Sequence, residues 1–361
     1  AKRAGARYMV LTAKHHDGFT LWPSRVSDFS VAAASWKGGK GDVIKEYVEA
    51  CRRYDMRCGL YYSPAEQTER FKTSDDEAYD HYILDQLGEL LRGYGEIDIL
   101  WLDGCGSETH NYDWGRILGN VRRMQPNILV FNMGDPDIRW VGNEAGVAPA
   151  NLFNTVTHVP FSVRTDEEAE AGGGEPRWLP AECPCRMRER NWFFSDRDEH
   201  TLKSLDELMG VYYYSVGRGG NLLLNIGPDR RGLFPDKDSR RLLEFGETVA
   251  KRFERPALTL KDFKPEKNRA VFETDESVLV DHAIVQEDLA KGERIRRFRI
   301  AVTPFPYGRE EVTVYEGYSV GHKAICRFPL VRAKRIAFEI VESSGPVSLR
   351  SLDLYNTEKL R

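Results

Sequence analysis

The hydrophobic positions in the first two thirds of the chain follow two alternating patterns. Short apolar runs predict buried strands over residues 8–13, 58–62, 97–102, 128–132, 138–143, 178–182 and 222–226. Between these runs, apolar residues recur at helical spacing over residues 42–54, 77–91, 112–124, 202–216 and 239–253. Strands that alternate with helices over about 250 residues are typical of parallel α/β folds.

The number of predicted strands suggests a barrel that misses one strand. The seven runs above are one fewer than a closed (β/α)8 barrel contains. The sequence begins at Ala1, with neither a Met nor a visible signal peptide, so we expect the eighth strand to belong to a preceding segment. The predicted fold is α/β: a (β/α)8-like, TIM-type barrel lacking its N-terminal strand.

The pattern changes after residue 255, where helical periodicity ends. Short alternating runs follow over residues 270–272, 278–281, 297–302, 311–314, 323–328, 335–340 and 347–355. They predict an antiparallel β-sandwich. We therefore expect two domains, a catalytic barrel over residues 1–255 and a C-terminal sandwich over residues 256–361. Residues 151–176 show no period, and we expect an active-site loop there.

Composition excludes several classes of partner. The 361 residues include 52 basic and 56 acidic ones, so the formal net charge is −4 and nucleic acid is not the expected partner. No apolar run approaches the ~20 residues of a membrane span. The six cysteines contain no CxxC pair, which argues against a zinc site. The sequence does not indicate an oligomeric state.

One apolar run ends abruptly in a carboxylate. Residues 97–102 lead directly into Asp103 and Gly104. The carboxyl ends of barrel strands form the active-site rim, so a carboxylate there predicts a nucleophile or an electrostatic stabiliser. The alternative is an Asp that only caps the turn after the strand.

Two adjacent histidines, His15 and His16, follow the first predicted strand, before Asp17. Side chains alternate along extended chain, so at least one histidine is expected to face the cleft and bind substrate hydroxyls. Histidine and aspartate are also metal ligands. A metal-dependent hydrolase that uses His15, His16 and Asp17 therefore remains an alternative.

A second carboxyl group would complete a glycosidase site. Glycoside hydrolysis uses two carboxyl groups, and in retaining enzymes one is the nucleophile and the other the acid/base. Glu144, which ends the stretch 137–144, is the first candidate, and Glu182, at the end of the next predicted strand, is the second. Trp140 or Trp178 could supply the apolar wall that raises the pKa of such an acid.

These features together resemble glycoside hydrolase family 29, the retaining α-L-fucosidases. Residues 14–19 (KHHDGF), with Leu-Trp-Pro-Ser at 21–24, resemble the family's fucose-binding segment, and 59–63 (GLYYS) resemble its next strand. Residues 101–104 (WLDG) match its nucleophile signature, and 219–228 (GGNLLLNIGP) match its late-strand signature. The four matches occur in family order over about 220 residues.

The resemblance implies a double-displacement mechanism without a metal or organic cofactor. Asp103 would form the covalent fucosyl intermediate, and Glu144 or Glu182 would transfer the proton. The implied substrate is a fucosylated oligosaccharide or glycoconjugate, and the segment 137–144 is similar to the branch that prefers α-1,3/1,4 linkages. The residues expected to bind substrate are His15, His16, Trp22, Tyr61, Tyr62, Trp101, Arg139 and Glu182.

Two features limit the resemblance. The family places a first strand, with another sugar-contacting His and Trp, before the position where this chain begins. The C-terminal domain resembles galactose-binding-type carbohydrate modules, but a plain packing domain is an equal alternative.

A secreted or periplasmic location is our expectation for the whole protein. A non-catalytic sugar-binding protein on the same scaffold is the competing function.

Overall fold

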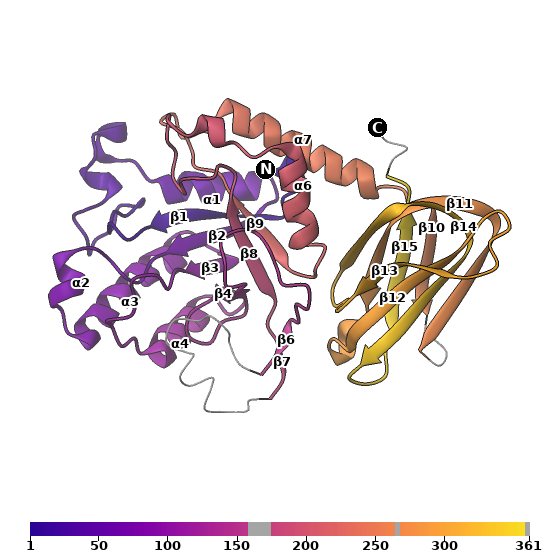
Figure 1. Ribbon diagram of the computed structural model, residues 1–361. Helices are drawn as coiled ribbons and strands as arrows, with labels where there is room; N and C mark the ends of the chain where they lie inside the picture. Colours follow the sequence, from indigo (N-terminus) through magenta and orange to yellow (C-terminus); the bar gives the residue numbers. More distant parts are fainter. Residues whose placement is uncertain (158–174, 264–267, 358–361) are drawn as a thin grey trace. The chain divides into compact units, whose positions relative to one another are not determined.

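The computed structural model describes residues 1–157, 175–263 and 268–357, and it contains an α/β part and an antiparallel sheet (Figure 1). The chain divides into two compact units. Ala1–Trp140 makes up most of the first unit, and Val141–Val156 with Pro176–Arg361 make up the second. The domain boundary expected at residue 255 remains a prediction.

A parallel sheet of four strands organises the first unit. Its strands, in spatial order, are β1 (Tyr8–Lys14), β2 (Arg57–Tyr62), β3 (Ile99–Leu102) and β4 (Leu129–Phe131). The register pairs Thr12 with Tyr61, Tyr61 with Trp101, and Trp101 with Phe131. Because all four strands run the same way, their carboxyl ends share one edge of the sheet.

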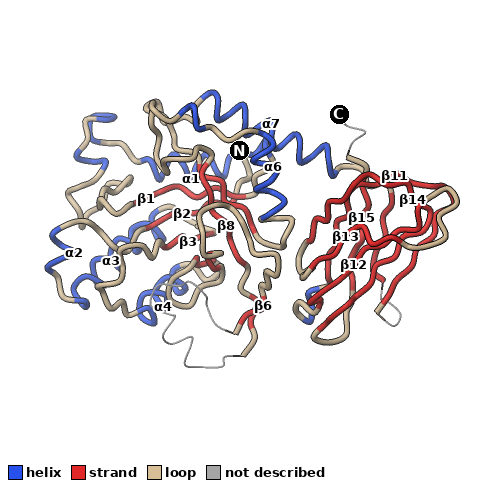
Figure 2. The backbone as a smooth tube through the Cα atoms, in the orientation of Figure 1, coloured by secondary structure: helices blue, strands red, loops and turns tan. Residues whose placement is uncertain are grey.

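Helices follow the strands as the periodicity predicts, and Figure 2 shows them in blue beside the sheet. They are α1 (Val43–Arg53), α2 (Glu69–Thr73), α3 (Asp76–Gly93) and α4 (Trp114–Met124), with short 3-10 turns at η1 (Lys2–Ala4), η2 (Val31–Ala33) and η3 (Trp36–Gly39). Asp42, Asp75 and Asp113 cap α1, α3 and α4 by accepting a backbone N–H of the first turn. The short helix α2 was not predicted.

The remaining α/β elements lie mainly in the second unit. β5 (Arg139–Trp140) ends the first unit, and β6 (Thr155–Val156) pairs with β7 (Arg177–Trp178) in antiparallel fashion. β8 (Ala181–Arg186) pairs in parallel with β9 (Asn221–Asn225). The helices are η4 (Glu199–Thr201), α6 (Leu205–Tyr214) and α7 (Asp236–Phe253). Closure of a barrel remains a prediction.

Two predicted strands need correction. The strand expected over residues 138–143 is only the two-residue β5. The strand expected over residues 178–182 is split between β7 and β8, and Glu182 is the second residue of β8. Cys183 and Cys185 are buried and extend β8 beyond the glutamate. The charged residue was taken as the end of the strand, but its side chain is buried too, so the strand continues through it.

The C-terminal strands form one antiparallel sheet in the order β10-β15-β11-β14-β12-β13. Phe298, Ile300 and Phe338 lie in its buried core. Two pairs of predicted short runs are single long strands, and β10 was not predicted. The elements are β10 (Leu258–Phe263), β11 (Arg269–Glu287), η5 (Leu289–Lys291), β12 (Ile295–Pro304), β13 (Val312–Gly317), β14 (Ala324–Ser343) and β15 (Leu349–Tyr355).

The sandwich arrangement itself remains a prediction, and the active-site loop expected over residues 151–176 lies largely outside the described residues. Among the helices that the structure describes, none has the length and apolar character needed to cross a membrane.

Candidate active site

Asp103 directly follows the carboxyl end of β3, and each of its two carboxylate oxygens accepts a hydrogen bond. Its Oδ2 accepts a hydrogen bond of 2.5 Å from the Tyr61 hydroxyl, and its Oδ1 accepts one of 3.0 Å from the Cys105 backbone N–H. The Nε2 atom of His16 is 3.5 Å from Oδ2. The Asp103 side chain remains 24% exposed, so the carboxylate is held in place and still open to a ligand.

A row of stacked rings supports Tyr61. Its ring stacks on His15 on one side and on Trp101 on the other, with centroid distances of 5.4 and 5.3 Å, and Trp101 stacks on Phe131 at 4.0 Å. The register of the parallel strands aligns Tyr61, Trp101 and Phe131, so these rings share one face of the sheet. The row orients the Tyr61 hydroxyl toward Asp103.

Burial raises the pKa of Tyr61 far above its usual value, and the charge of Asp103 and the hydrogen bond to it add to this effect. Tyr61 therefore stays a neutral phenol that donates to Asp103.

The two histidines after β1 have different roles. The Ser63 hydroxyl donates to the Ala65 carbonyl at 2.6 Å, so at its contact of 2.6 Å with His16 Nδ1 the histidine is the donor. This leaves His16 Nε2 facing Asp103. The His15 ring meets the His16 ring edge to face at 4.3 Å. Burial, and next the charge of His16, lower the pKa of His15, which favours a neutral ring.

A buried ion pair stabilises the end of β1. Lys14 Nζ lies 2.5 Å from Glu66 Oε1, and both side chains are almost fully buried. Burial lowers the pKa of Lys14 to about 8, although Glu66 opposes the shift. Glu66 also accepts a hydrogen bond from Thr68. Because Lys14 directly precedes His15, this pair holds the turn that carries the histidines.

Two residues expected to bind substrate are core residues instead. Trp22 is 1% exposed, and its indole N–H donates to Glu89 Oε2 at 2.8 Å. Tyr62 is completely buried, and its hydroxyl donates to Gln86 at 2.7 Å. Side chains alternate along a strand, so Tyr62 points to the face opposite Tyr61. The expectation that Trp22 and Tyr62 line the site is therefore corrected.

Arg139 and Trp101 remain candidates for substrate binding. Trp101 is half-buried in the ring row. Arg139, in the short strand β5, is buried. A contact of either residue with a sugar remains a prediction.

The two candidate acid/base residues differ in access to solvent. Glu144 is exposed in a loop, where the adjacent Asn143 binds the Val147 carbonyl and the Ala145 N–H. Glu182 is 1% exposed, and its Oε2 accepts a hydrogen bond of 3.0 Å from Asn221. An acid/base must reach the leaving oxygen and then a water molecule. The exposed carboxyl group meets that requirement better.

The residues that could hold a metal ion are not quite those expected. Donor atoms of His15, His16 and Asp103 all lie within 4.8 Å of one another. Asp17 is exposed, and its Oδ1 accepts from the Phe19 N–H instead. Asp103 thus takes the place that the sequence interpretation gave to Asp17.

A further histidine, missed from the sequence, anchors the loop after Asp103. His110 Nδ1 lies 3.0 Å from Asp76, and its Nε2 lies 3.1 Å from Asp80. Asp80 also accepts from the Asp113 N–H at the start of α4. His110 is buried between two carboxylates on α3, and only its place in the loop after Asp103 could have indicated it.

An open carboxylate at the carboxyl edge of a parallel sheet, with histidines and a wall of aromatic rings, defines the class of site found in glycoside hydrolases. Comparison with known proteins agrees. A sequence profile described as Alpha-L-fucosidase matches residues 1–252. The chain belongs to the alpha-L-fucosidase family of glycoside hydrolases, so the resemblance drawn from the motifs is confirmed.

Individual relatives show how far the similarity extends. Alpha-L-fucosidase 1 of Arabidopsis thaliana is 32% identical over 98% of this chain and 77% of its own. Plasma alpha-L-fucosidase of Homo sapiens is 29% identical, over 67% of this chain and 50% of its own.

Solved structures give the same result. A glycoside hydrolase 29 family member from an unknown rumen bacterium matches with a TM-score of 0.86 and 30% identity, over 99% of this chain and 68% of that one. A Bacteroides ovatus structure matches with a TM-score of 0.89 and 33% identity, and this chain spans 65% of its length.

Proposed function

We propose that this chain carries the catalytic machinery of a retaining exo-α-L-fucosidase, with Asp103 as nucleophile. The observation that supports this most directly is the environment of Asp103. Its carboxylate is accessible, it is oriented by Tyr61 and the Cys105 N–H, and it faces His16. A carboxylate that only capped a turn would not need a stacked row of rings to orient its second oxygen.

The reaction follows from two carboxyl groups with separate roles. A carboxylate oxygen of Asp103 attacks the anomeric carbon of the terminal fucose while the bond to the leaving oxygen breaks. Glu144, as the acid, gives its proton to that oxygen. Glu144 then removes a proton from water, which attacks the same carbon, releases fucose and regenerates Asp103.

Tyr61 and the histidines prepare this step. The Tyr61 phenol donates to the ionised carboxylate and holds it in one rotamer before attack. In a neutral imidazole that donates from Nδ1 to Ser63, His16 Nε2 accepts, so it can take a hydrogen bond from a sugar hydroxyl beside Asp103. His15 is half-buried, and its ring contacts the His16 ring beside Asp103.

We assign the acid/base role to Glu144 rather than to Glu182. A carboxyl group that protonates a leaving oxygen and later activates water must be reachable from solvent, and Glu144 is exposed. Glu182 is buried and hydrogen-bonded to Asn221. Glu182 is therefore better placed to support the strand pair β8–β9 than to exchange protons with a substrate.

The proposed substrate is a fucosylated oligosaccharide or glycoconjugate, with α-1,3 or α-1,4 linked fucose. Alpha-L-fucosidases of plants, animals and Dictyostelium discoideum are among the relatives. The linkage preference is proposed from the similarity of segment 137–144 to the branch of the family that prefers α-1,3/1,4 linkages. The competing function, sugar binding without turnover, does not require an oriented and accessible carboxylate at position 103.

Two measurements test the proposal. The purified chain should hydrolyse an aryl α-L-fucoside but neither an aryl α-galactoside nor an aryl β-glucoside. A 2-fluoro-fucosyl fluoride should label Asp103, which peptide mass spectrometry would detect as a fluorofucosyl ester. Fucose binding without hydrolysis by a folded chain would favour the sugar-binding alternative, and stoichiometric metal with metal-dependent turnover would favour the site of His15, His16 and Asp103.

A further inference from the structure

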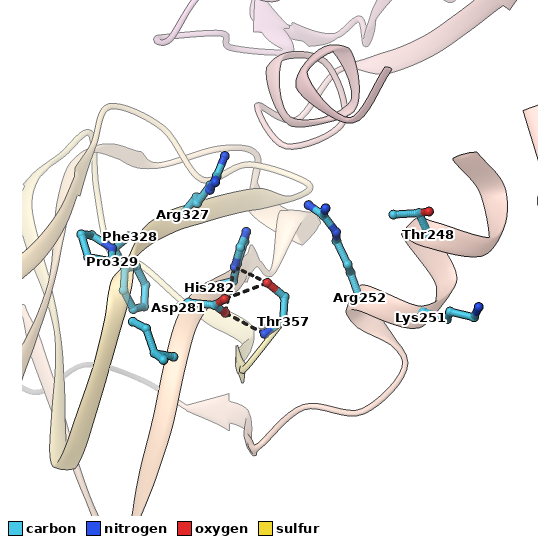
Figure 3. Close-up of a pocket in the computed structure, with 10 residues that line it drawn as sticks. Thr248, Lys251, Arg252, Asp281, His282, Arg327, Phe328, Pro329 and Thr357 are labelled. Carbon is cyan, nitrogen blue, oxygen red and sulfur yellow. Dashed lines mark hydrogen bonds and ion pairs between the residues drawn. The ribbon is translucent and has the colours of Figure 1, made fainter. Parts of the chain in front are cut away.

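The second unit contains a cavity that none of the sequence motifs described above lines. It has a volume of about 550 Å³ and lies between the last turns of α7 and the strands β11 and β14 (Figure 3). Arg252 comes from α7, His282 from β11, and Arg327 and Phe328 from β14. Cavities of this size accommodate small organic ligands.

Two positively charged arginine side chains, Arg252 and Arg327, line this cavity. In Figure 3 the guanidinium groups of Arg327 and Arg252 lie on either side of the His282 ring. Neither forms an ion pair with an acidic residue of the described chain, and the one hydrogen bond of Arg252 among those residues goes to the Tyr213 hydroxyl. The guanidinium groups therefore keep most of their N–H donors for a ligand.

The single carboxylate among the residues that line the cavity has its oxygens occupied by hydrogen bonds from its neighbours. Asp281 accepts hydrogen bonds from the Thr357 N–H and hydroxyl at 2.9 and 2.7 Å, and it lies 3.0 Å from His282 Nδ1. His282 Nε2 in turn lies 2.9 Å from the Tyr213 hydroxyl. Asp281 and His282 are buried, and neither forms an ion pair with Arg252 or Arg327 in the part of the chain that the structure describes.

Stabilisation of a helix end explains the position of only one of the two arginines. Basic residues in the last turn of a helix interact favourably with its carbonyl groups, and Arg252 belongs to the last turn of α7. Arg327 belongs to a strand and is exposed, so that explanation does not apply to it. Two arginines from separate elements on one cavity match the planar, bidentate recognition of oxyanions.

We propose that this cavity binds an acidic saccharide through a carboxylate or sulfate group held between Arg327 and Arg252. The apolar wall of Phe328, Pro329 and Leu330 offers a surface for the carbon-bound hydrogens of a sugar ring. The cavity is larger than a single inorganic anion requires, so the saccharide is the favoured source of the charge. This site is separate from the fucoside chemistry assigned to Asp103, and its test does not depend on turnover.

Calorimetry or ligand-observed NMR tests the proposal on the whole chain. The probes are glucuronic acid and galactose 6-sulfate, with galactose as the neutral comparison and sodium sulfate as the inorganic one. The variant Arg327→Gln removes one side of the clamp. The matched control Arg332→Gln removes the same charge from an exposed position on the same strand, outside the cavity lining.

We expect the acidic sugars to bind, galactose not to bind, and Arg327→Gln to weaken binding at least about tenfold, because it removes one partner of a charge-assisted hydrogen bond. Arg332→Gln should bind as the parent does. Equal losses in both variants would show nonspecific attraction and overturn the proposal. Sulfate that binds as tightly as the acidic sugars would overturn the saccharide part, and no binding of any anion would overturn all of it.

Discussion

Two of the histidine–aspartate pairs in the described residues, one in each unit, lie in contrasting surroundings. In the first unit, His16 and Asp103 are 3.5 Å apart with side chains 19% and 24% exposed. In the second unit, His282 and Asp281 are 3.0 Å apart with side chains only 3% and 7% exposed. The same residue types thus form an open pair at the edge of a parallel sheet and a closed pair inside an antiparallel one.

The two carboxylates differ in how much of their hydrogen-bonding capacity remains unused. Asp281 is saturated by Thr357 and His282, so its charge stabilises the fold and does little else. Asp103 is oriented by Tyr61 and the Cys105 N–H but keeps part of its surface open to a ligand. Exposure and unused hydrogen-bonding capacity therefore distinguish a reactive carboxylate from a structural one, and the following predictions test that distinction.

The largest effect should come from the open pair. Asp103→Asn should lower kcat by several orders of magnitude, because an amide cannot form the covalent ester intermediate. Thermal unfolding should be nearly unchanged, since the amide oxygen can still accept from Tyr61. Steady-state kinetics with an aryl α-L-fucoside and calorimetric Tm measure both effects. Asp17→Asn, on the exposed turn nearby, is the matched control, and near-normal turnover by Asp103→Asn would contradict the assignment.

The second prediction concerns Glu144, the carboxyl group that we propose as the acid/base. Glu144→Ala should lose turnover on fucosides with poor leaving groups, and azide should partly restore it on activated aryl fucosides. Glu182→Ala should lose stability instead, because it leaves Asn221 without its carboxylate partner. If azide restores the turnover of Glu182→Ala and not that of Glu144→Ala, Glu182 is the acid/base and Glu144 is not.

The closed pair should respond in the opposite way. Asp281→Ala should destabilise the fold by about 2–4 kcal/mol, because buried partners of a charged group lose their hydrogen bonds. The KM and kcat on fucosides should change little at temperatures where the variant is folded. Asp275→Ala, at an exposed position of the same strand, should leave the Tm almost unchanged. A large loss of kcat in folded Asp281→Ala would contradict the prediction that the closed pair contributes to stability and not to turnover.

The smallest effect is a dependence of stability on pH. Burial lowers the pKa of His282 below 6.5, although Asp281 opposes the shift. The unfolded chain therefore binds this proton more readily than the folded chain, so stability is lost as the pH falls below 6.5. His282→Gln should reduce the slope of Tm against pH between about pH 5 and 6.5. An unchanged slope would show that His282 is not the group involved.

Much of the first unit could be predicted from the sequence. The carboxyl ends of β2 and β3, the presence of α1, α3 and α4, and the position of Asp103 at a strand end all follow from local patterns. These features depend on residues within a few positions of one another. The extent of β8 was misjudged, because a buried glutamate in a strand looks locally like the end of one.

The sequence by itself determined most strands and helices of the first unit and the carboxylate that ends β3, because hydrophobic periodicity acts between near neighbours, but it missed α2 and β10. Only the tertiary structure decided that Tyr61 faces Asp103 while Tyr62 and Trp22 are in the core. It alone brought Arg327 and Arg252 to one cavity, 75 positions apart in the chain (327 − 252). Burial and hydrogen-bond partners depend on packing between distant segments, and no local pattern records that packing.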